Sequence, residues 1–345
     1  MPPTIPNLTP VKKTASVVVL LSGGLDSAVA IRLMLDQGLN VVALNFVSPF
    51  CTCSPRKAGG CSLAAQVARN LDVELRVMAK GPDYLRIVEH PRFGTGRGLN
   101  PCIDCRIYML RKAAALMAEI GAVAVVTGEV LGQRPMSQHR RALDVIERES
   151  GLTGCLLRPL SARHLPPTIP EQEGKIDRKA LLDLSGRTRS PQLALARERG
   201  VEVFGCPSGG CLLTDPVITR RLRDVFAHCP DWDERDARLA TLGRHLRLHP
   251  ALKLILGRNA AENDRLEHLA GNLPRIMPAD IVGPSAVPCG IATKPDLETI
   301  GRVMRRYTPK AGDGIMTLRM THDGKETVWT AAEAATDEEI KRWTI

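Results

Sequence analysis

The sequence predicts an α/β fold: a doubly wound parallel sheet followed by a smaller C-terminal α+β domain. Apolar, β-branched segments alternate with helical patterns up to about residue 224, and strands separated by helices pair in parallel through right-handed crossovers. The segment SGGLDS, residues 22–27, joins the first apolar segment to a helical pattern, as ligand-binding turns of such sheets do. A length of 345 residues allows two domains, each with its own core.

The expected elements follow one another in a regular order. Strands are predicted at 17–21, 41–46, 74–79, 122–127 and 152–157. Helices are predicted at 28–37, 63–71, 103–120, 176–184 and 191–200. Residues 1–16 are expected to form a loose lead-in and 165–170 an exposed excursion, and beyond residue 236 the pattern becomes α+β.

Charge divides the chain in a similar way. Residues 1–224 carry 30 Lys and Arg against 20 Asp and Glu, whereas 225–345 carry 17 of each. We therefore expect a first domain at 17–224, a boundary near 226–236 and a second domain at 236–345. The net charge of +10 fits a polyanionic partner such as RNA, although solubility alone also explains it. Because aromatic residues are only 3%, we expect a folded, duplex-rich RNA rather than a stacked single strand.

The composition also indicates a compartment. No stretch approaches the roughly 18 apolar residues of a membrane helix, and the start, MPPTIPNLTPVKK, lacks the apolar core of a secretory signal. We expect a cytoplasmic protein with no membrane partner. Its ten cysteines are then ligands, nucleophiles or core residues rather than a disulfide framework.

The SGGLDS turn has the features of a phosphate-binding loop. Gly23 and Gly24 allow the backbone to approach an anion, and the hydroxyls of Ser22 and Ser27 can donate hydrogen bonds at the start of a helix. Asp26 would repel phosphate unless a cation intervenes, and Mg²⁺ binds one or two carboxylates together with phosphate oxygens. The turn lacks the lysine of nucleoside triphosphatase loops. The alternative is a serine–glycine turn that only caps a helix.

The cysteines form three groups. Cys102 and Cys105 form a C-x-x-C at the start of the expected long helix, where the helix N-terminus favours a thiolate. Cys206 and Cys211 lie in a glycine-rich segment, GCPSGGCLLTD. The C-x-C-x₇-C set is either a structural zinc site or a loop without metal, and it comprises Cys51, Cys53 and Cys61. Cysteines outside these groups are expected to be buried and inert, and these are Cys155, Cys229 and Cys289.

Two thiolates and a third from a glycine loop support several chemistries. They could bind zinc, hold a 4Fe–4S cluster or act as a redox pair. A cluster with three protein ligands leaves one iron open to carry an extra sulfide. Alternatively, Cys105 or Cys211 carries a persulfide. Histidine adds no ligand spacing, and the residues expected at the surface are His139, His164, His245 and His249.

Four segments, in this order, resemble the pyrophosphatase-loop tRNA uridine sulfurtransferases, which include 4-thiouridine synthetases and 2-thiouridylases. They are SGGLDS, then NPCIDCR at 100–106, then TGEVLGQRPMSQ at 127–138, and finally GGCLL around Cys211. The resemblance covers about residues 17–215 and implies an adenine nucleotide alpha hydrolase-like fold. The chain departs from 4-thiouridine synthetases in having no RNA-binding module before the loop and no trailing sulfur-carrier domain.

The resemblance implies roles for particular residues. ATP pyrophosphate and Mg²⁺ would be bound by Ser22, Gly23, Gly24, Leu25, Asp26 and Ser27. Gly128, Glu129 and Gln133 would lie near the adenylate. Cys102, Cys105 and Cys211 would ligate the cluster or pass sulfur, and together with Asp26 they are the catalytic candidates. Arg158-Pro159-Leu160 would close the sheet. Arg187 and Arg189 are our own candidates for RNA phosphate contacts, the alternative being solvated loop charge.

The implied activity is an ATP-dependent tRNA sulfurtransferase. It would adenylate a uridine carbonyl oxygen, releasing pyrophosphate, and replace that oxygen with sulfur. TGEVLGQRPMSQ favours 4-thiouridine at position 8, whereas NPCIDCR favours wobble 2-thiouridine, and we prefer the former. Expected partners are tRNA, a sulfur donor (sulfide or a persulfide carrier such as a cysteine desulfurase) and a second copy in a homodimer. The alternatives are a small-molecule adenylating synthetase and a metal-stapled RNA-binding protein with an inactive ATP site.

The C-terminal part carries a second resemblance. The segment from Leu242, LGRHLRLHPALKLILGRNAAEN, is similar to a small RNA-binding domain of ribosome quality-control factors. The resemblance implies that tRNA binding is supplied from the C-terminal side.

Overall fold

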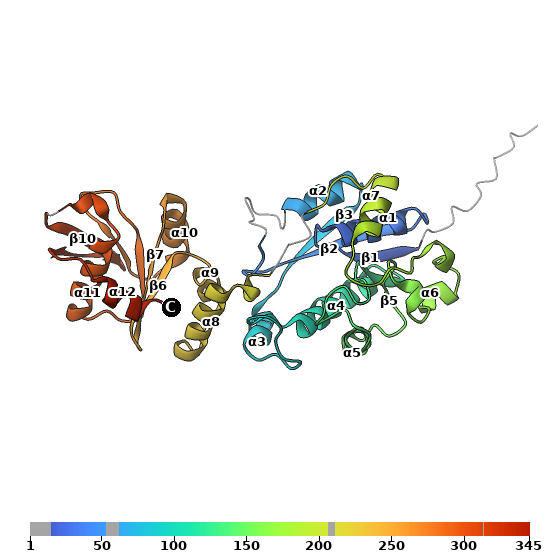
Figure 1. Cartoon of the computed structure of the whole chain (residues 1–345), viewed down its shortest axis with the longest axis horizontal. Helices are drawn as coiled ribbons and strands as arrows, with labels where there is room; N and C mark the ends of the chain where they lie inside the picture. The colour runs from blue at the N-terminus through green and yellow to red at the C-terminus, as the bar shows by residue number, and fades with distance from the viewer. Residues whose placement is uncertain (1–14, 53–61, 206–210, 313) are drawn as a thin grey trace, which may run out of the picture. The chain divides into compact units, whose positions relative to one another are not determined.

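The computed structural model describes residues 15–52, 62–205, 211–312 and 314–345 (Figure 1). These residues divide into two compact units. The first contains the chain up to Gly96 and again from Asn100 to the region before Cys211, and the second contains Arg97–Leu99 and Cys211–Ile345. In the described residues, no helix combines the length and apolar character needed to span a bilayer.

The first unit is built on a parallel sheet with strand order β3-β2-β1-β4-β5. The strands are β1 (Ser16–Leu20), β2 (Asn40–Val47), β3 (Glu74–Ala79), β4 (Ala124–Thr127) and β5 (Leu156–Leu157). The helices are α1 (Leu25–Leu35), α2 (Ser62–Asn70), α3 (Pro82–Glu89), α4 (Cys102–Glu119), α5 (Arg140–Ser150), α6 (Ile169–Gln172) and α7 (Ser190–Glu198). The predicted α/β class is confirmed.

Both faces of this sheet are covered, which makes it doubly wound. Val17 and Val19 of β1 point into a core shared with α1, α2 and α7. Val18 and Leu20 point into a second core shared with α4 and α5. A strand buried on both faces requires a continuous apolar run, and β1 has one. The chain leaves β1 towards β2 and later returns on the other side as β4, so the loops after β1 and β4 flank the position where the strand order reverses.

Two predicted elements of the first unit differ from the structure. The predicted helix at 176–184 is wrong, because only a short 3₁₀ turn, Arg178–Ala180, forms there. The Asp177 carboxylate accepts a hydrogen bond from the Lys179 amide, and such local side-chain bonds compete with helix. The following segment runs extended, since Leu182 donates to the Pro159 carbonyl. The predicted strand at 152–157 is shortened to β5 by a turn before it.

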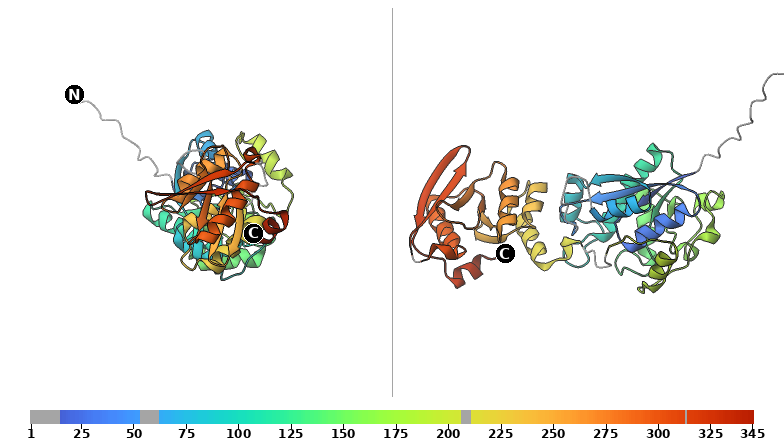
Figure 2. Two further views of the ribbon diagram at one scale, coloured as in Figure 1. Left: turned by 90° about the vertical axis from the view of Figure 1, so that its left-hand side faces the viewer. Right: turned by 90° about the horizontal axis from the view of Figure 1, so that it is seen from above.

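The second unit is an antiparallel sheet with order β11-β10-β8-β9-β7-β6. Its strands are β6 (Arg244–His249), β7 (Leu252–Leu256), β8 (Arg275–Pro278), β9 (Ala286–Cys289), β10 (Met316–His322) and β11 (Lys325–Ala331). Its helices are α8 (Pro216–His228), α9 (Glu234–Leu239), α10 (Ala260–Ala270), α11 (Lys294–Arg306) and α12 (Asp337–Trp343). The β10–β11 hairpin, red in Figure 2, forms one edge of the sheet. Helices α11 and α12 pack against one core, and α9 and α10 against another.

The division between the units falls earlier in the chain than the expected boundary near 226–236. Residues 211–224, assigned from sequence to the first domain, group with the second unit. Helix α8 is tied to that unit by Arg221, whose buried guanidinium donates hydrogen bonds to the carbonyls of Ala240, Leu242 and Gly243. Burial lowers the pKa of Arg221 to about 10.

The histidines follow the sequence expectation only in part. His139 and His164 are exposed, and His249 is half-buried. The prediction of a surface position is wrong for His245, which is 1% exposed. Its ring lies against the carbonyls of Leu239 and Leu242, and burial, with Arg221 and Lys253 nearby, holds its pKa well below the usual value.

Replacing Arg221 with Met should destabilise the second unit. Three buried carbonyls would lose a charged donor, which we expect to lower the free energy of unfolding by about 2–3 kcal/mol. All three tryptophans of the chain lie in this unit, so urea unfolding followed by tryptophan fluorescence reports on it. The control is Arg220→Met, because Arg220 is exposed on the same helix. Equal midpoints for the two variants would contradict the role of Arg221.

Candidate functional site

The SGGLDS loop leaves β1 and starts α1 with an open backbone. Gly23 has φ +80°, and a Cβ there would lie 3.0 Å from the Ala64 nitrogen. Gly24 is the N-cap of α1, and Ser27 Oγ donates to its carbonyl at 2.8 Å. Ser22 Oγ lies 3.2 Å from Ser27 Oγ. The helix therefore starts within the loop, which is the arrangement that binds anions.

The loop after β4 packs directly on this turn. A Cβ on Gly128 would lie 2.5 Å from the carbonyl carbon and oxygen of Asp26, so only glycine fits there. Gln133 Nε2 donates to Asp26 Oδ2 at 2.8 Å, and Gln192 Nε2 donates to Gln133 Oε1 at 3.3 Å. The structure thus brings together Asp26, Gly128 and Gln133, which the sequence placed at one site.

Asp26 keeps one oxygen for another ligand. Its Oδ1 is buried and has no hydrogen-bond partner among the described residues, while a guanidinium nitrogen of Arg189 lies 3.8 Å from Oδ2. An unpartnered carboxylate oxygen beside a phosphate-type loop is a suitable donor for Mg²⁺. Arg189, which the sequence suggested for RNA contacts, therefore belongs to this loop site, whereas Arg187 is exposed.

Ion pairs of the buried Glu129 side chain anchor the loop that follows β4. This side chain is 1% exposed and lies 3.1 Å from Arg158 Nε and 3.3 Å from Arg106 Nε. Burial acts to raise its pKa, but the two arginines outweigh burial and the pKa is lowered. Arg158 is itself 2% exposed and also pairs with Glu147. The carboxylate of Glu129 is thus occupied by arginines, and we assign it a positioning role.

The C-x-x-C motif occupies the first turn of α4. Lys80 Nζ, just after β3, donates to Cys105 Sγ at 3.0 Å, and the Tyr84 hydroxyl donates at 3.6 Å. Lys80 also lies 4.3 Å from the centre of the Tyr84 ring. The sequence did not indicate Lys80 or Tyr84, because only the folded chain brings β3 and α3 to α4.

Cys102 differs from its neighbour. Burial raises the pKa of the Cys102 thiol, and Cys105 adds to this effect, whereas Arg106 and Arg134 oppose it without reversing it. Burial of Cys102 therefore acts against the thiolate character that a helix N-terminus favours. The two cysteines of the motif therefore have different surroundings, since the ammonium group of Lys80 donates a hydrogen bond to Cys105.

Two arginines contact the loops directly. Arg189 lies 3.8 Å from Asp26 Oδ2, and Arg106 of α4, the residue after Cys105, lies 3.3 Å from Glu129 Oε1. Arg134 is exposed; partial desolvation and repulsion from Arg106 and Arg189 lower its pKa, while Cys102 and Asp26 oppose this effect. Both Arg106 and Arg134 lie inside segments that carry the resemblance, at 100–106 and 127–138, but the sequence assigned no role to either.

The donor set for an iron–sulfur cluster is not assembled in the described residues. No group of three His, Cys, Asp or Glu side chains is positioned there for a metal ion. Cys102 and Cys105 belong to the first unit, whereas Cys211 belongs to the second. Cys53, Cys61 and Cys206 lie outside the described residues. We therefore assign no cluster and derive no step from one.

Cys155, Cys229 and Cys289 are half-buried rather than buried as expected. Cys155 packs beside the core next to α4 and α5. Burial raises the pKa of Cys289 to about 11 and also raises that of Cys229. Cys51, the described member of the C-x-C-x₇-C set, is half-buried, with Ser48 Oγ 3.5 Å from its sulfur.

Comparison with known proteins identifies two domains. Residues 13–164 match the family described as thiamine biosynthesis protein (ThiI), and residues 243–344 match the NFACT protein RNA binding domain. Both resemblances indicated by the sequence are confirmed. The second match covers most of the second unit.

Individual relatives match over part of their length. A Methanosarcina acetivorans protein named "Probable tRNA sulfurtransferase" is 32% identical over 36% of this chain and 30% of its own length. A tRNA-specific 2-thiouridylase MnmA of Azorhizobium caulinodans is 26% identical over 70% of this chain and 63% of its own. A crystal structure of a 4-thiouridine synthetase–RNA complex with bound ATP is similar at 25% identity and a TM-score of 0.38, covering 66% of this chain and 54% of that one. The chain spans about a third of the first of these relatives.

Replacing Gly128 with Ala should weaken ATP binding. The new Cβ would clash with the Asp26 backbone, so the SGGLDS loop must move, and we expect an affinity loss of at least about tenfold. Isothermal titration with a non-hydrolysable ATP analogue measures it. Gly314→Ala is the control, because its Cβ meets only an ordinary contact. An unchanged affinity in Gly128→Ala would show that the two loops are not tightly coupled.

Replacing Glu129 with Gln should change how stability depends on pH. The pKa of Glu129 is lower in the folded chain than in the unfolded chain. The contribution of Glu129 to the free energy of unfolding is therefore complete above the unfolded-state pKa and is lost as the pH falls through the folded-state pKa. At pH 7 the variant should unfold about 2–4 kcal/mol more easily, since two arginines lose their buried partner. Circular dichroism in urea should show the difference shrinking towards pH 3. The exposed Glu119→Gln serves as control, and a pH-independent difference would contradict the assignment.

Proposed function

We propose that this chain, which carries a ThiI family domain and an NFACT-type RNA binding domain, is an ATP-dependent tRNA sulfurtransferase. One observation carries the proposal: two consecutive residues of the loop after β4 join the SGGLDS loop to the C-x-x-C helix. Gly128 packs on the Asp26 backbone, and Glu129 lies 3.3 Å from Arg106, the residue after Cys105 on α4. An enzyme that only adenylates a small molecule needs no paired cysteines there.

The nucleotide is bound by the two loops that flank β1 and β4. Backbone amides and hydroxyls of residues 22–27 contact the phosphates, with Gly128 and Gln133 holding the loop in place. Arg189, 3.8 Å from Asp26 Oδ2, adds positive charge that stabilises the leaving pyrophosphate. Asp26 would supply the carboxylate that holds Mg²⁺, and the cation would neutralise phosphate charge there.

Activation of the base precedes the entry of sulfur. The uridine carbonyl oxygen attacks the α-phosphorus of ATP, pyrophosphate leaves, and the oxygen becomes part of an AMP ester. A sulfur nucleophile then attacks the ring carbon, and AMP departs with the original oxygen. The protein holds the reacting groups in position and supplies fixed charge, and these two effects account for most of the rate acceleration in such transfers.

Cysteine residues deliver the sulfur. Cys105 is the better supported carrier in the first unit, because Lys80 and Tyr84 donate hydrogen bonds to its sulfur and an ammonium group stabilises negative charge on it. Cys102 and Cys211 are the proposed partners in sulfur transfer. A persulfide carrier transfers its outer sulfur to Cys105. That sulfur attacks the ring carbon, a partner cysteine then releases the thiolated base by forming a disulfide with Cys105, and an external dithiol reduces the disulfide. Free sulfide instead attacks the activated ring carbon directly, because sulfide cannot form a persulfide on a thiol without an oxidant.

The proposed product is 4-thiouridine at position 8 of tRNA. Residues 127–138 follow β4 and supply Gly128 and Gln133 to the site, and this is the segment that resembles 4-thiouridine synthetases. Wobble 2-thiouridine is the second candidate, favoured by the similarity to a 2-thiouridylase. We further propose that the second unit binds the tRNA, that the protein acts in the cytoplasm and that it forms a homodimer.

Pyrophosphate release from ATP tests the activity directly. Purified full-length protein, unmodified tRNA and sodium sulfide should release pyrophosphate only when tRNA is present, and mass spectrometry of the digested tRNA should detect 4-thiouridine. Release without tRNA would indicate a small-molecule synthetase, and no release would indicate an RNA-binding protein. Detection of 2-thiouridine instead would identify the second candidate.

Two variants separate activation from sulfur transfer. Asp26→Asn should reduce tRNA-dependent pyrophosphate release by about a hundredfold or more, because the cation loses its carboxylate. Cys211→Ala should abolish thiolation while leaving ATP binding intact, and Cys229→Ala, in the same unit, is its control. Thiolation by Cys211→Ala at the wild-type rate would refute its role.

A further inference from the structure

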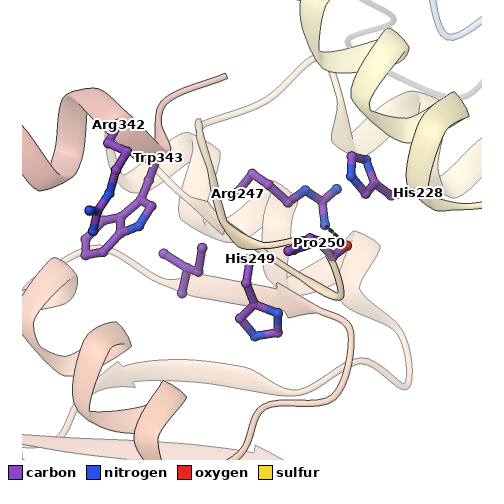
Figure 3. Close-up of a pocket in the computed structure, with 7 residues that line it drawn as sticks. His228, Arg247, His249, Pro250, Arg342 and Trp343 are labelled. Carbon is purple, nitrogen blue, oxygen red and sulfur yellow. Dashed lines mark hydrogen bonds between the residues drawn. The ribbon is translucent and has the colours of Figure 1, made fainter.

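The second unit contains a cavity of about 320 Å³ that lies apart from the SGGLDS site in sequence. Its lining comes from the end of α8, the end of β6 with the following turn, and the end of α12. The lining residues are His228, Arg247, Leu248, His249, Pro250, Arg342 and Trp343. Arg342 and Trp343 lie on one side of the close-up, and Arg247 and His228 on the other (Figure 3).

A bulge in β6 forms one wall. The pairing of β6 with β7 shifts between Arg247 and His249, and a bulge of this kind redirects side chains at the end of a strand. Consecutive residues of one strand therefore line the same cavity. This volume is at the lower end for small-ligand sites, enough for a single nucleotide.

The lining is cationic. It contains two arginines and no carboxylate. Asp224 lies behind it and accepts two hydrogen bonds from Arg247, at 2.9 and 2.6 Å, while Arg247 also donates to the Pro250 carbonyl at 3.3 Å. This arginine is therefore fixed and shapes the wall.

Arg342 has a different position. It is exposed, makes no ion pair with any described residue, and lies 5.5 Å from the centre of the Trp343 ring. Trp343 is 8% exposed, so the indole supports the guanidinium from the core side. A guanidinium plane supported in this way can stack with a nucleobase and attract a phosphate.

The two histidines supply hydrogen-bonding groups of different kinds. In His249, Nδ1 accepts from the Ala251 amide and Nε2 lies 3.2 Å from Asp296 Oδ1, so both nitrogens are engaged. In His228, Nδ1 lies 2.9 Å from the Asp224 carbonyl oxygen. Its Nε2 remains for a ligand and, in the neutral ring, accepts a hydrogen bond such as that of a ribose hydroxyl.

We infer that this cavity binds one unpaired RNA nucleotide, with its base against Arg342, its phosphate near the same guanidinium and its ribose hydroxyl at His228. The inference rests on the proposed function, because it requires that the chain bind RNA, and it deepens that proposal by locating a subsite. It differs from general phosphate attraction because it needs an unstacked base.

Binding of short RNA to the full chain tests this subsite. A fluorescein-labelled six-nucleotide single strand and an equally labelled blunt duplex are titrated by anisotropy at fixed salt. Arg342→Ala should weaken binding of the single strand by about tenfold and of the duplex by less than about twofold. Lys341→Ala removes the same charge from the neighbouring exposed position of α12 and should change neither by more than about twofold. His228→Ala should weaken the single strand alone.

Competition identifies the part of the nucleotide that is recognised. Uridine monophosphate should displace the single strand from the wild-type protein, whereas inorganic phosphate at the same concentration should not. Equal losses in Arg342→Ala and Lys341→Ala, equal losses for single strand and duplex, or equal competition by phosphate would each overturn the inference. If wild type thiolates tRNA and Arg342→Ala binds the single strand as wild type does, the nucleotide subsite is rejected and the proposed function stands. If Arg342→Ala loses binding of the single strand but wild type does not thiolate tRNA, the subsite stands and the proposed function is rejected.

Discussion

The close approach of Gly128 to the backbone of Asp26 is the constraint on which the first unit depends. It holds two loops from neighbouring strands in contact at the point where the strand order reverses. Gln133 then reaches Asp26, and Glu129, one residue after the glycine, is fixed by Arg158 below. The SGGLDS loop is therefore supported by buried polar contacts rather than by its own few hydrogen bonds.

Local pattern was sufficient to predict the parallel sheet, because β1, β2 and β4 each combine an apolar run with a helix that follows it. The SGGLDS turn was identifiable from its own residues, and Gln133 from the resemblance of its segment. Lys80 and Tyr84 were not, since they reach Cys105 only when β3 and α3 pack against α4. The segment at 176–184 was misassigned because its backbone bonds to another part of the chain: the amides of Leu182 and Leu184 donate to the carbonyls of Pro159 and Leu160.

Average composition was a poor guide to the second unit. Its acidic and basic residues are equal in number, yet several acidic side chains are used in capping helices and in pairs such as Glu339 with Arg302. Arg342 is left without such a pair among the described residues. Equal numbers of acidic and basic residues thus conceal a local excess of positive charge at Arg342. The sequence cannot show this excess, because it does not show which charged side chains are paired. The burial of His245 could not be predicted for a similar reason. The polar ring is tolerated in the core because it lies against two backbone carbonyls, those of Leu239 and Leu242, which are known only from the fold.

The placement of Arg97–Leu99 affects how the chain can be divided. These three residues pack with the second unit while the chain on both sides of them belongs to the first. The Leu99 amide donates to the Leu213 carbonyl, and Gly98 has φ +71° with no room for a Cβ beside that carbonyl. The polypeptide therefore crosses between the units three times. A fragment ending at residue 210 would leave Gly98 and Leu99 without their packing partners immediately before α4, so a single cut of the chain does not separate the two units cleanly.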